Sequence, residues 1–122
     1  PYARIRPSSE INNNVQIGNF VEIKSSVIGA DCKINHLSYI GDASLENDVI
    51  IGAGTITCNF DGSKTNQTFI GEGSFIGSGV QLIAPIKIGK KTIIGAGSTI
   101  TKSVPHNKLS ISRSKQVIID KK

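Results

Sequence analysis

A six-residue spacing of large aliphatic side chains restricts the fold of this 122-residue sequence more than any other feature. The longest unbroken run of this spacing comprises Ile70, Ile76, Leu82, Ile88, Ile94 and Ile100. The same spacing begins at Ile5 and reaches Thr57, with two steps of five residues on the way. An amphipathic helix repeats about every 3.6 residues, and the strands of a sandwich alternate about every two. A sustained period of six therefore predicts an all-β repeat architecture.

Each hexapeptide carries a second residue suited to an interior. Two positions before the large aliphatic residue stands a small or β-branched one, such as Val21, Cys32 or Ser74. Side chains two apart on a strand point to the same side, so each hexapeptide is predicted to form one short face followed by a corner. Three faces close a triangular coil of about 18 residues. The sixteen faces from Ile5 to Ile100 predict a parallel β-helix of about five coils over residues 1–102.

Two segments depart from the repeat. Thr57 and Ile70 are 13 residues apart, and residues 58–67 between them are polar and are predicted to protrude as a loop. Insertions in repeat proteins often shape a binding site, and a neutral insertion is the alternative. After Ile100 the pattern dissolves, and residues 103–122 are predicted to form a basic C-terminal tail. Its apolar patch, 117–119, is expected to cap the last coil or to pack on a neighbouring subunit.

Composition argues against several classes of function. The net charge of +5 is scattered and aromatic residues make up 5%, so no nucleic-acid partner is predicted and a phosphate-bearing small molecule is favoured. Two histidines are too few for a hexapeptide metal enzyme, so no metal is predicted. No apolar run is long enough to predict a membrane span. Two cysteines and the lack of a signal peptide favour a cytoplasmic protein, and the missing initiator methionine indicates a piece of a longer chain.

Specific strings of the sequence resemble one enzyme family in a single collinear register. They are Ala-Arg-Ile-Arg-Pro (3–7), Gly-Asn-Phe-Val-Glu-Ile-Lys (18–24), His-Leu-Ser-Tyr-Ile-Gly-Asp-Ala (36–43), Ile-Gly-Ala-Gly-Thr-Ile-Thr-Cys-Asn-Phe-Asp-Gly (51–62) and Ile-Ser-Arg (111–113). Together they resemble the C-terminal acetyltransferase domain of the bifunctional N-acetylglucosamine-1-phosphate uridyltransferase / glucosamine-1-phosphate N-acetyltransferase. The resemblance implies a left-handed β-helix and a homotrimer with active sites between subunits.

The same resemblance implies a reaction. The acetyl group of acetyl-CoA, a co-substrate, is transferred to the 2-amino group of glucosamine 1-phosphate. The product, N-acetylglucosamine 1-phosphate, serves UDP-N-acetylglucosamine and cell-envelope synthesis. Uridylyl transfer is not predicted, because the family's N-terminal nucleotidyltransferase domain has no counterpart in these residues.

The resemblance also assigns the acceptor side of the site. His36 matches the general base of the family, and an imidazole is able to accept the proton that the sugar amine loses as the amide forms. A polar corner residue is the alternative for His36, and His106 is expected to be merely solvated. The matched sugar-phosphate residues are Arg6, Lys24, Tyr39, Asn59 and Phe60. Arginine and lysine suit phosphate oxygens, whereas Phe60 lacks the hydroxyl of the usual tyrosine.

On the acetyl-CoA side the matches are Ala53, Ser78, Ala96 and Arg113. The resemblance implies that the two alanines act through their backbone groups and through being small. An amide N–H at Ala53 suits the oxyanion that forms when the thioester carbonyl becomes tetrahedral. Arg113 is expected to reach the phosphates of CoA.

Two positions depart from the family pattern on the sugar side. Ile50 stands where the family has an asparagine that binds the amino sugar, and Thr65 stands where it has a loop lysine, with Lys64 one position earlier. An isoleucine makes no hydrogen bond to a sugar hydroxyl. The alternatives to the leading prediction are therefore an acetyltransferase for a different amino sugar and a non-catalytic trimeric scaffold.

Overall fold

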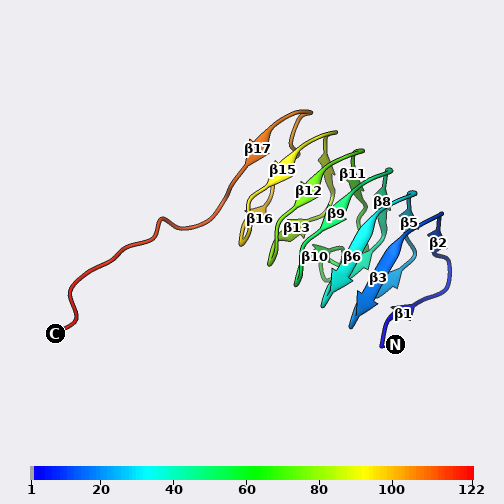
Figure 1. Cartoon of the computed structure of the whole chain (residues 1–122), viewed down its shortest axis with the longest axis horizontal. Helices are drawn as coiled ribbons and strands as arrows, with labels where there is room; N and C mark the ends of the chain where they lie inside the picture. Colours follow the sequence, from blue (N-terminus) through cyan, green and yellow to red (C-terminus); the bar gives the residue numbers. More distant parts are fainter. Residues whose placement is uncertain (1) are drawn as a thin grey trace.

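The computed structural model describes residues 2–122, and all of its regular elements are short β-strands (Figure 1). Sheet A contains β1 (Arg4–Ile5), β4 (Glu22–Lys24), β7 (Tyr39–Gly41), β10 (Ile56–Cys58), β13 (Gln81–Ile83) and β16 (Thr99–Ile100). Sheet B contains β2 (Glu10–Ile11), β5 (Val27–Ile28), β8 (Ala43–Leu45), β11 (Thr68–Ile70) and β14 (Ile86–Ile88). Sheet C contains β3 (Gln16–Asn19), β6 (Lys33–His36), β9 (Ile50–Ile51), β12 (Phe75–Ile76), β15 (Ile93–Ile94) and β17 (Leu109–Ser110). A helix able to cross a bilayer is absent from these residues.

From β1 to β16, successive strands visit sheets A, B and C in turn, and each strand pairs in parallel with the strand three elements away. Three strands therefore make one turn of a triangular coil, as Figure 1 shows. The predicted parallel β-helix is confirmed, and its form is consistent with left-handed coiling. Within residues 2–122, seventeen strands give nearly six turns: the first sixteen match the sixteen predicted faces, and β17 adds one more strand.

The interior is a ladder of the aliphatic residues that define the repeat. In sheet A, for example, Ile23 pairs with Ile40, and both side chains are fully buried. Thr57 takes the inward position of the next coil, where its hydroxyl oxygen accepts a 2.7 Å hydrogen bond from the N–H of Gly41. Burying an isoleucine side chain stabilises a fold by about 1.5 to 3 kcal/mol, so this ladder is the main source of stability. At the N-terminal end, Ile5 remains 46% exposed because no coil covers it.

The corners rely on two local devices. A residue with left-handed φ occurs at most of them, and Asn14, Asp31 and Asp48 are examples with φ near 60°. Asparagine and aspartate tolerate this conformation better than other residues that bear a Cβ. The small hydroxyl residues that point inward bind corner carbonyls, as when the Ser74 hydroxyl donates to the Gly89 carbonyl at 2.7 Å. Buried corner carbonyls thereby gain a partner.

Strand stacking continues past residue 102, into the segment predicted as a tail. Val104 is buried and bridges in parallel to Ile88, and β17 then pairs with β15. The repeat is hidden there because Ser110 lies opposite Ile94, where an aliphatic residue was expected. Residues 113–122 contain no strand and lead away from the prism (Figure 1). The apolar patch at 117–119 is exposed in the single chain, so the expected packing of this patch stays a prediction.

The close stacking of coils generates a first prediction. A Cβ added at Gly77 would lie 2.6 Å from the backbone N of Ala96 and 2.8 Å from its Cα, and backbone cannot rotate away. Gly77→Ala should therefore lower the free energy of unfolding by about 2 to 3 kcal/mol through overpacking. Chemical denaturation measures this change.

Gly73→Ala is the matched control for Gly77→Ala. Gly73 has φ +72°, and the nearest atom to an added Cβ is 3.5 Å away on the Lys91 side chain, so the cost is backbone strain of roughly 1 to 2 kcal/mol. A larger loss for Gly73→Ala than for Gly77→Ala would contradict the role of close coil stacking.

Candidate active site

The predicted general base and three predicted acetyl-CoA residues lie along one corner of the prism, between sheets C and A. We call the column His36, Ala53, Ser78 and Ala96 the His36 edge. Backbone hydrogen bonds connect its members coil by coil: the carbonyls of His36, Ala53 and Ser78 accept from Gly54, Gly79 and Gly97 at 3.2, 2.8 and 2.8 Å. The Ala96 carbonyl accepts from the guanidinium of Arg113, which ends the column. Residues spread over nearly 80 positions of sequence thus form one straight line.

The His36 edge offers hydrogen-bond donors to a ligand. Among residues 2–122, the backbone N–H groups of Ala53, Ser78 and Ala96 have no protein acceptor. The imidazole of His36 is exposed beside them, and Ala53 is half-buried. Successive coils are about 4.8 Å apart, so the edge from His36 to Arg113 is roughly 19 Å long. An elongated ligand with several acceptors fits such a row of donors.

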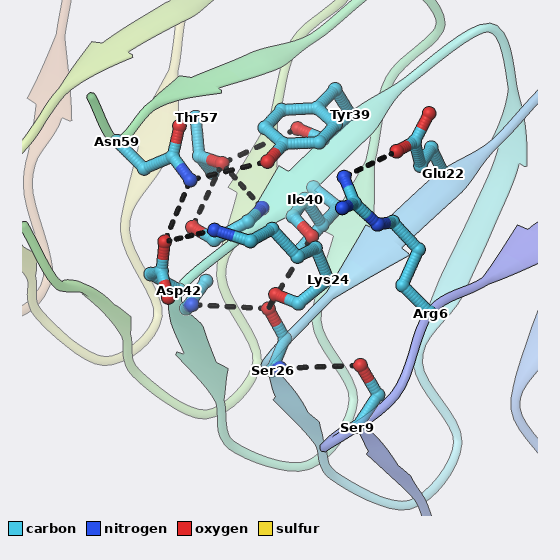
Figure 2. A network of polar contacts seen from close by, with 12 residues as sticks. Arg6, Ser9, Glu22, Lys24, Ser26, Tyr39, Ile40, Asp42, Thr57 and Asn59 are labelled. Carbon is cyan, nitrogen blue, oxygen red and sulfur yellow. Dashed lines mark hydrogen bonds and ion pairs between the residues drawn. The ribbon is translucent and has the colours of Figure 1, made fainter. Parts of the chain in front are cut away.

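Most of the predicted sugar-phosphate residues meet at the next corner, between sheets A and B (Figure 2). The Lys24 ammonium lies 3.5 Å from an Asp42 carboxylate oxygen. The Asn59 side-chain amide donates to the same Asp42 oxygen at 2.7 Å and to the Tyr39 hydroxyl at 3.1 Å. We call Lys24, Tyr39, Asp42 and Asn59 the polar network.

Arg6 lies one coil below the polar network. Its guanidinium forms a 3.1 Å ion pair with Glu22, and both side chains are about one-third exposed. Glu22 is the register partner of Tyr39 on the adjacent strand, which places Arg6 beside the network (Figure 2). Two cations, Arg6 and Lys24, are therefore presented along this corner, each held by a carboxylate.

The loop 58–67 is a compact turn. Phe60 and Thr65 form an antiparallel bridge, and the Phe60 side chain is 63% exposed. The Asp61 carboxylate closes the turn by accepting 2.9 Å hydrogen bonds from the N–H groups of Ser63 and Lys64. Phe60, a predicted sugar residue, is thus not part of the polar network and projects from the turn.

The remaining chemically relevant groups lie apart. The outward side chain of Ile50 sits on sheet C between Lys33 and Phe75, at 38% exposure. Burial raises the pKa of the Cys32 and Cys58 thiols, so neither is an activated nucleophile at neutral pH. No three histidine, cysteine, aspartate or glutamate side chains converge as metal ligands in the described chain.

A cavity of about 290 Å³ lies on sheet B, away from the His36 edge. It is lined by residues that include Glu46, Phe69, Lys87 and His106. The Nδ1 atom of His106 accepts a 2.7 Å hydrogen bond from the N–H of Lys90, so this histidine is tied to backbone as well as solvated. The two histidines of the chain therefore occupy separate faces.

Three residues around the site, Glu22, Asp42 and Thr57, were not among the predicted ones. Glu22 and Asp42 are the carboxylates that hold Arg6 and Lys24. Both lie inside the strings that carry the family resemblance. The signal that points to them is a carboxylate 16 or 18 residues after a cation, which is about one coil away.

The Asp61 turn generates a pH prediction. Hydrogen bonds from Lys64, Ser63 and Asn66 lower the pKa of Asp61, because they favour the charged carboxylate. A lowered folded pKa means that this stabilisation is present above the ordinary aspartate pKa and is lost as pH falls through the folded value. The amide proton shifts of Ser63 and Lys64 should change together with the titration of this carboxylate, at a midpoint below the ordinary aspartate pKa.

NMR titration of the intact chain checks this, with Asp61→Asn as the control. In that variant both amide shifts should already differ at pH 7 and should not titrate. A midpoint at or above the ordinary aspartate pKa would show that the carboxylate does not hold the turn.

Sequence comparisons show similarity to hexapeptide-repeat proteins. Residues 67–102 match the family model described as bacterial transferase hexapeptide (six repeats). Over 117 residues the chain is 60% identical to the Bifunctional protein GlmU of Ruthia magnifica subsp. Calyptogena magnifica, which covers 96% of this chain and 26% of that protein. The chain thus spans about a quarter of the length of the curated relatives it matches.

Two solved structures have the same fold. A variant of GDP-perosamine N-acetyl transferase from Caulobacter crescentus, in complex with CoA and GDP-perosamine, has a TM-score of 0.82 at 27% identity, covering 91% of this chain and 50% of that chain. The acetyltransferase domain of PglB from Neisseria gonorrhoeae, in complex with acetyl coenzyme A, has a TM-score of 0.78 at 25% identity, covering 86% and 49%. The predicted resemblance is confirmed: the chain corresponds in sequence to the C-terminal, hexapeptide-repeat part of the bifunctional GlmU proteins.

Proposed function

We propose that this chain is an acetyl-CoA-dependent N-acetyltransferase that acetylates the 2-amino group of glucosamine 1-phosphate. The observation that supports this most strongly is the His36 edge, which aligns His36, Ala53, Ser78 and Ala96 and ends at Arg113. The similarity to GlmU proteins and the CoA and acetyl-CoA complexes of the two structural neighbours also support it.

The geometry supports a role for each group in this proposed reaction. The unpaired N–H groups of Ala53, Ser78 and Ala96 would hold acetyl-CoA along the edge, with its phosphates towards Arg113. The sugar amine attacks the thioester carbon, and the Ala53 N–H stabilises the oxyanion. The new C–N bond replaces the C–S bond, His36 accepts the proton that the amine loses, and the departing sulfur is protonated to free CoA. Arg6, Lys24, Tyr39 and Asn59 would bind the sugar phosphate.

We further propose a homotrimer whose active sites lie between subunits. The outer face of sheet C carries a column of exposed apolar residues in register: Ile50, Phe75, Ile93 and Leu109. A contiguous apolar patch of this kind marks an interaction surface. The column lies just before Ala53, Ser78, Ala96 and Arg113 in the chain, whereas Lys33 takes the equivalent position before His36, so a copy packed on the column would also border the edge. The family resemblance implies threefold symmetry. In a closed ring of three copies, each copy contacts its two neighbours through two different surfaces. The free thiols of Cys32 and Cys58 fit the cytoplasmic setting that we propose.

Acetyl transfer is tested by following free thiol release from acetyl-CoA with glucosamine 1-phosphate. His36→Ala should lower kcat about 100-fold or more, because general base catalysis contributes on that scale. His106→Ala, the matched control on sheet B, should leave turnover unchanged. Equal activity of the unmodified chain and His36→Ala would reject His36 as the base.

A panel of other amino sugars and amino-sugar phosphates in the same assay addresses the acceptor. Ile50 offers no hydrogen bond from sheet C, which favours a different amino sugar as the second candidate. Faster turnover of another sugar would identify that acceptor. No thiol release with any member of the panel would support the non-catalytic scaffold instead.

The subunit arrangement is tested by Phe75→Asp, which places a charge in the middle of the apolar column. Sedimentation should show that the unmodified chain has the mass of three chains and that the variant dissociates and loses acetyl transfer. Val27→Asp is the control, because Val27 is an equally exposed outward residue on sheet B, at 43%. A trimer that survives Phe75→Asp would place the interface elsewhere.

A further inference from the structure

Asp42 is the buried centre of the polar network, although no predicted role fell on it. The residue is 7% exposed, and one of its carboxylate oxygens meets both the Lys24 ammonium and the Asn59 amide (Figure 2). A buried carboxylate next to an expected phosphate site opposes an anionic ligand electrostatically. Its presence there therefore calls for a role that outweighs this repulsion.

The hydrogen-bond chemistry of Asp42 determines which way the Asn59 amide faces. An ionised carboxylate only accepts hydrogen bonds, so the NH₂ end of Asn59 must point at Asp42. The backbone of Asn59 is held on both sides, by its N–H to the Thr57 carbonyl at 3.0 Å and by its carbonyl to the Asn66 N–H at 2.6 Å. The side-chain torsions of Asn59 remain free under these backbone bonds, and the hydrogen bond to Asp42 restricts them and fixes which end of the amide faces the carboxylate.

The orientation of Asn59 in turn determines the direction of the Tyr39 hydroxyl. The second N–H of the Asn59 amide donates to the Tyr39 oxygen at 3.1 Å, so this oxygen is an acceptor in that contact. The hydroxyl proton of Tyr39 must therefore point elsewhere, and within residues 2–122 it meets no protein acceptor. Tyr39 is left as a donor to whatever binds at this corner.

Gly41 keeps Tyr39 and Asn59 together. A Cβ at this position would collide with the Tyr39 hydroxyl and would lie 2.6 Å from the Asn59 amide nitrogen. The Tyr39 and Asn59 side chains therefore meet above the backbone of Gly41, and their contact requires that this residue has no Cβ. The Asn59 amide alone therefore links the Asp42 carboxylate to the Tyr39 hydroxyl.

We propose that Asp42 is a positioning residue for the acceptor: through Asn59 it commits the Tyr39 hydroxyl to donate to an oxygen of the sugar phosphate, while it pins the Lys24 ammonium at the same corner. This inference rests on the proposed function, since it takes an amino-sugar phosphate as the ligand. Asp42 itself makes no contact with the reacting atoms.

The backbone of Asp42 has a separate structural role that the test must preserve. Its φ is +49°, its N–H donates to the Lys24 carbonyl at 2.9 Å and its carbonyl accepts from the Thr68 N–H at 3.1 Å. Asparagine tolerates this φ and keeps the shape of the side chain, so Asp42→Asn removes the charge and, because asparagine donates as well as accepts, no longer forces Asn59 to present its NH₂ end. Asp48→Asn is the control, because Asp48 is an exposed corner aspartate with φ +60°.

The experiment is a kinetic double-mutant cycle on the intact chain with Asp42→Asn, Tyr39→Phe and the combined variant, each checked by its melting temperature. Asp42→Asn should raise the KM for glucosamine 1-phosphate about tenfold and leave the KM for acetyl-CoA unchanged. In the Tyr39→Phe background the same change should have a much smaller effect, because the hydroxyl that Asp42 orients is gone. Asp48→Asn should alter neither KM. Calorimetric binding of glucosamine 1-phosphate alone provides a second readout.

Several outcomes would overturn the inference. A lower KM for the sugar phosphate in Asp42→Asn would show that removal of an anion outweighs positioning. Equal changes in both KM values, or a melting temperature that falls while neither KM moves, would show a structural role only. Full additivity in the cycle would separate Asp42 from Tyr39. An unmodified chain that neither turns over nor binds glucosamine 1-phosphate would reject the proposed function itself. If the unmodified chain is active, any of the results above would reject only the positioning role of Asp42.

Discussion

Parallel hydrogen bonding between successive coils is the constraint on which the rest of this structure depends. Because neighbouring strands stack about 4.8 Å apart, each corner residue lies directly over its equivalent in the coil before. The ladder of buried Ile23, Ile40 and their equivalents holds that stacking in register. Residues far apart in sequence therefore become neighbours in space, and a line of corner residues becomes a straight, rigid binding surface.

Sheet A lies between two such lines with different chemistry. The His36 edge presents an imidazole and free backbone donors, whereas the opposite corner presents Arg6, Lys24 and the polar network. An acetyl donor on one line and an anionic amino sugar on the other would meet across this face. The single chain leaves both lines open to solvent, and the apolar column on sheet C adjoins the first. Assembly and catalysis are thus proposed to depend on the same corner.

The period of six was sufficient to predict the β-helix and its core, because burial of one aliphatic residue per face leaves a direct trace in the sequence. It missed β17, because Ser110 occupies an inward position that is elsewhere aliphatic. A role for Asp42 was not predicted, for a different reason. A five-residue step shifts the register there, so Lys24 pairs with Gly41 and only side-chain geometry brings Asp42 to it. The six-residue period of aliphatic residues does not predict contacts that depend on corner conformation.

We propose that coil stacking turns the His36 edge into an acetyl-CoA site. A crystal structure of this chain with bound CoA would test this proposal. CoA should extend along the edge, with hydrogen bonds from the N–H groups of Ala53, Ser78 and Ala96 and with Arg113 at its phosphates. CoA bound elsewhere, for example in the sheet B cavity beside Lys87, with the edge left bare, would contradict it.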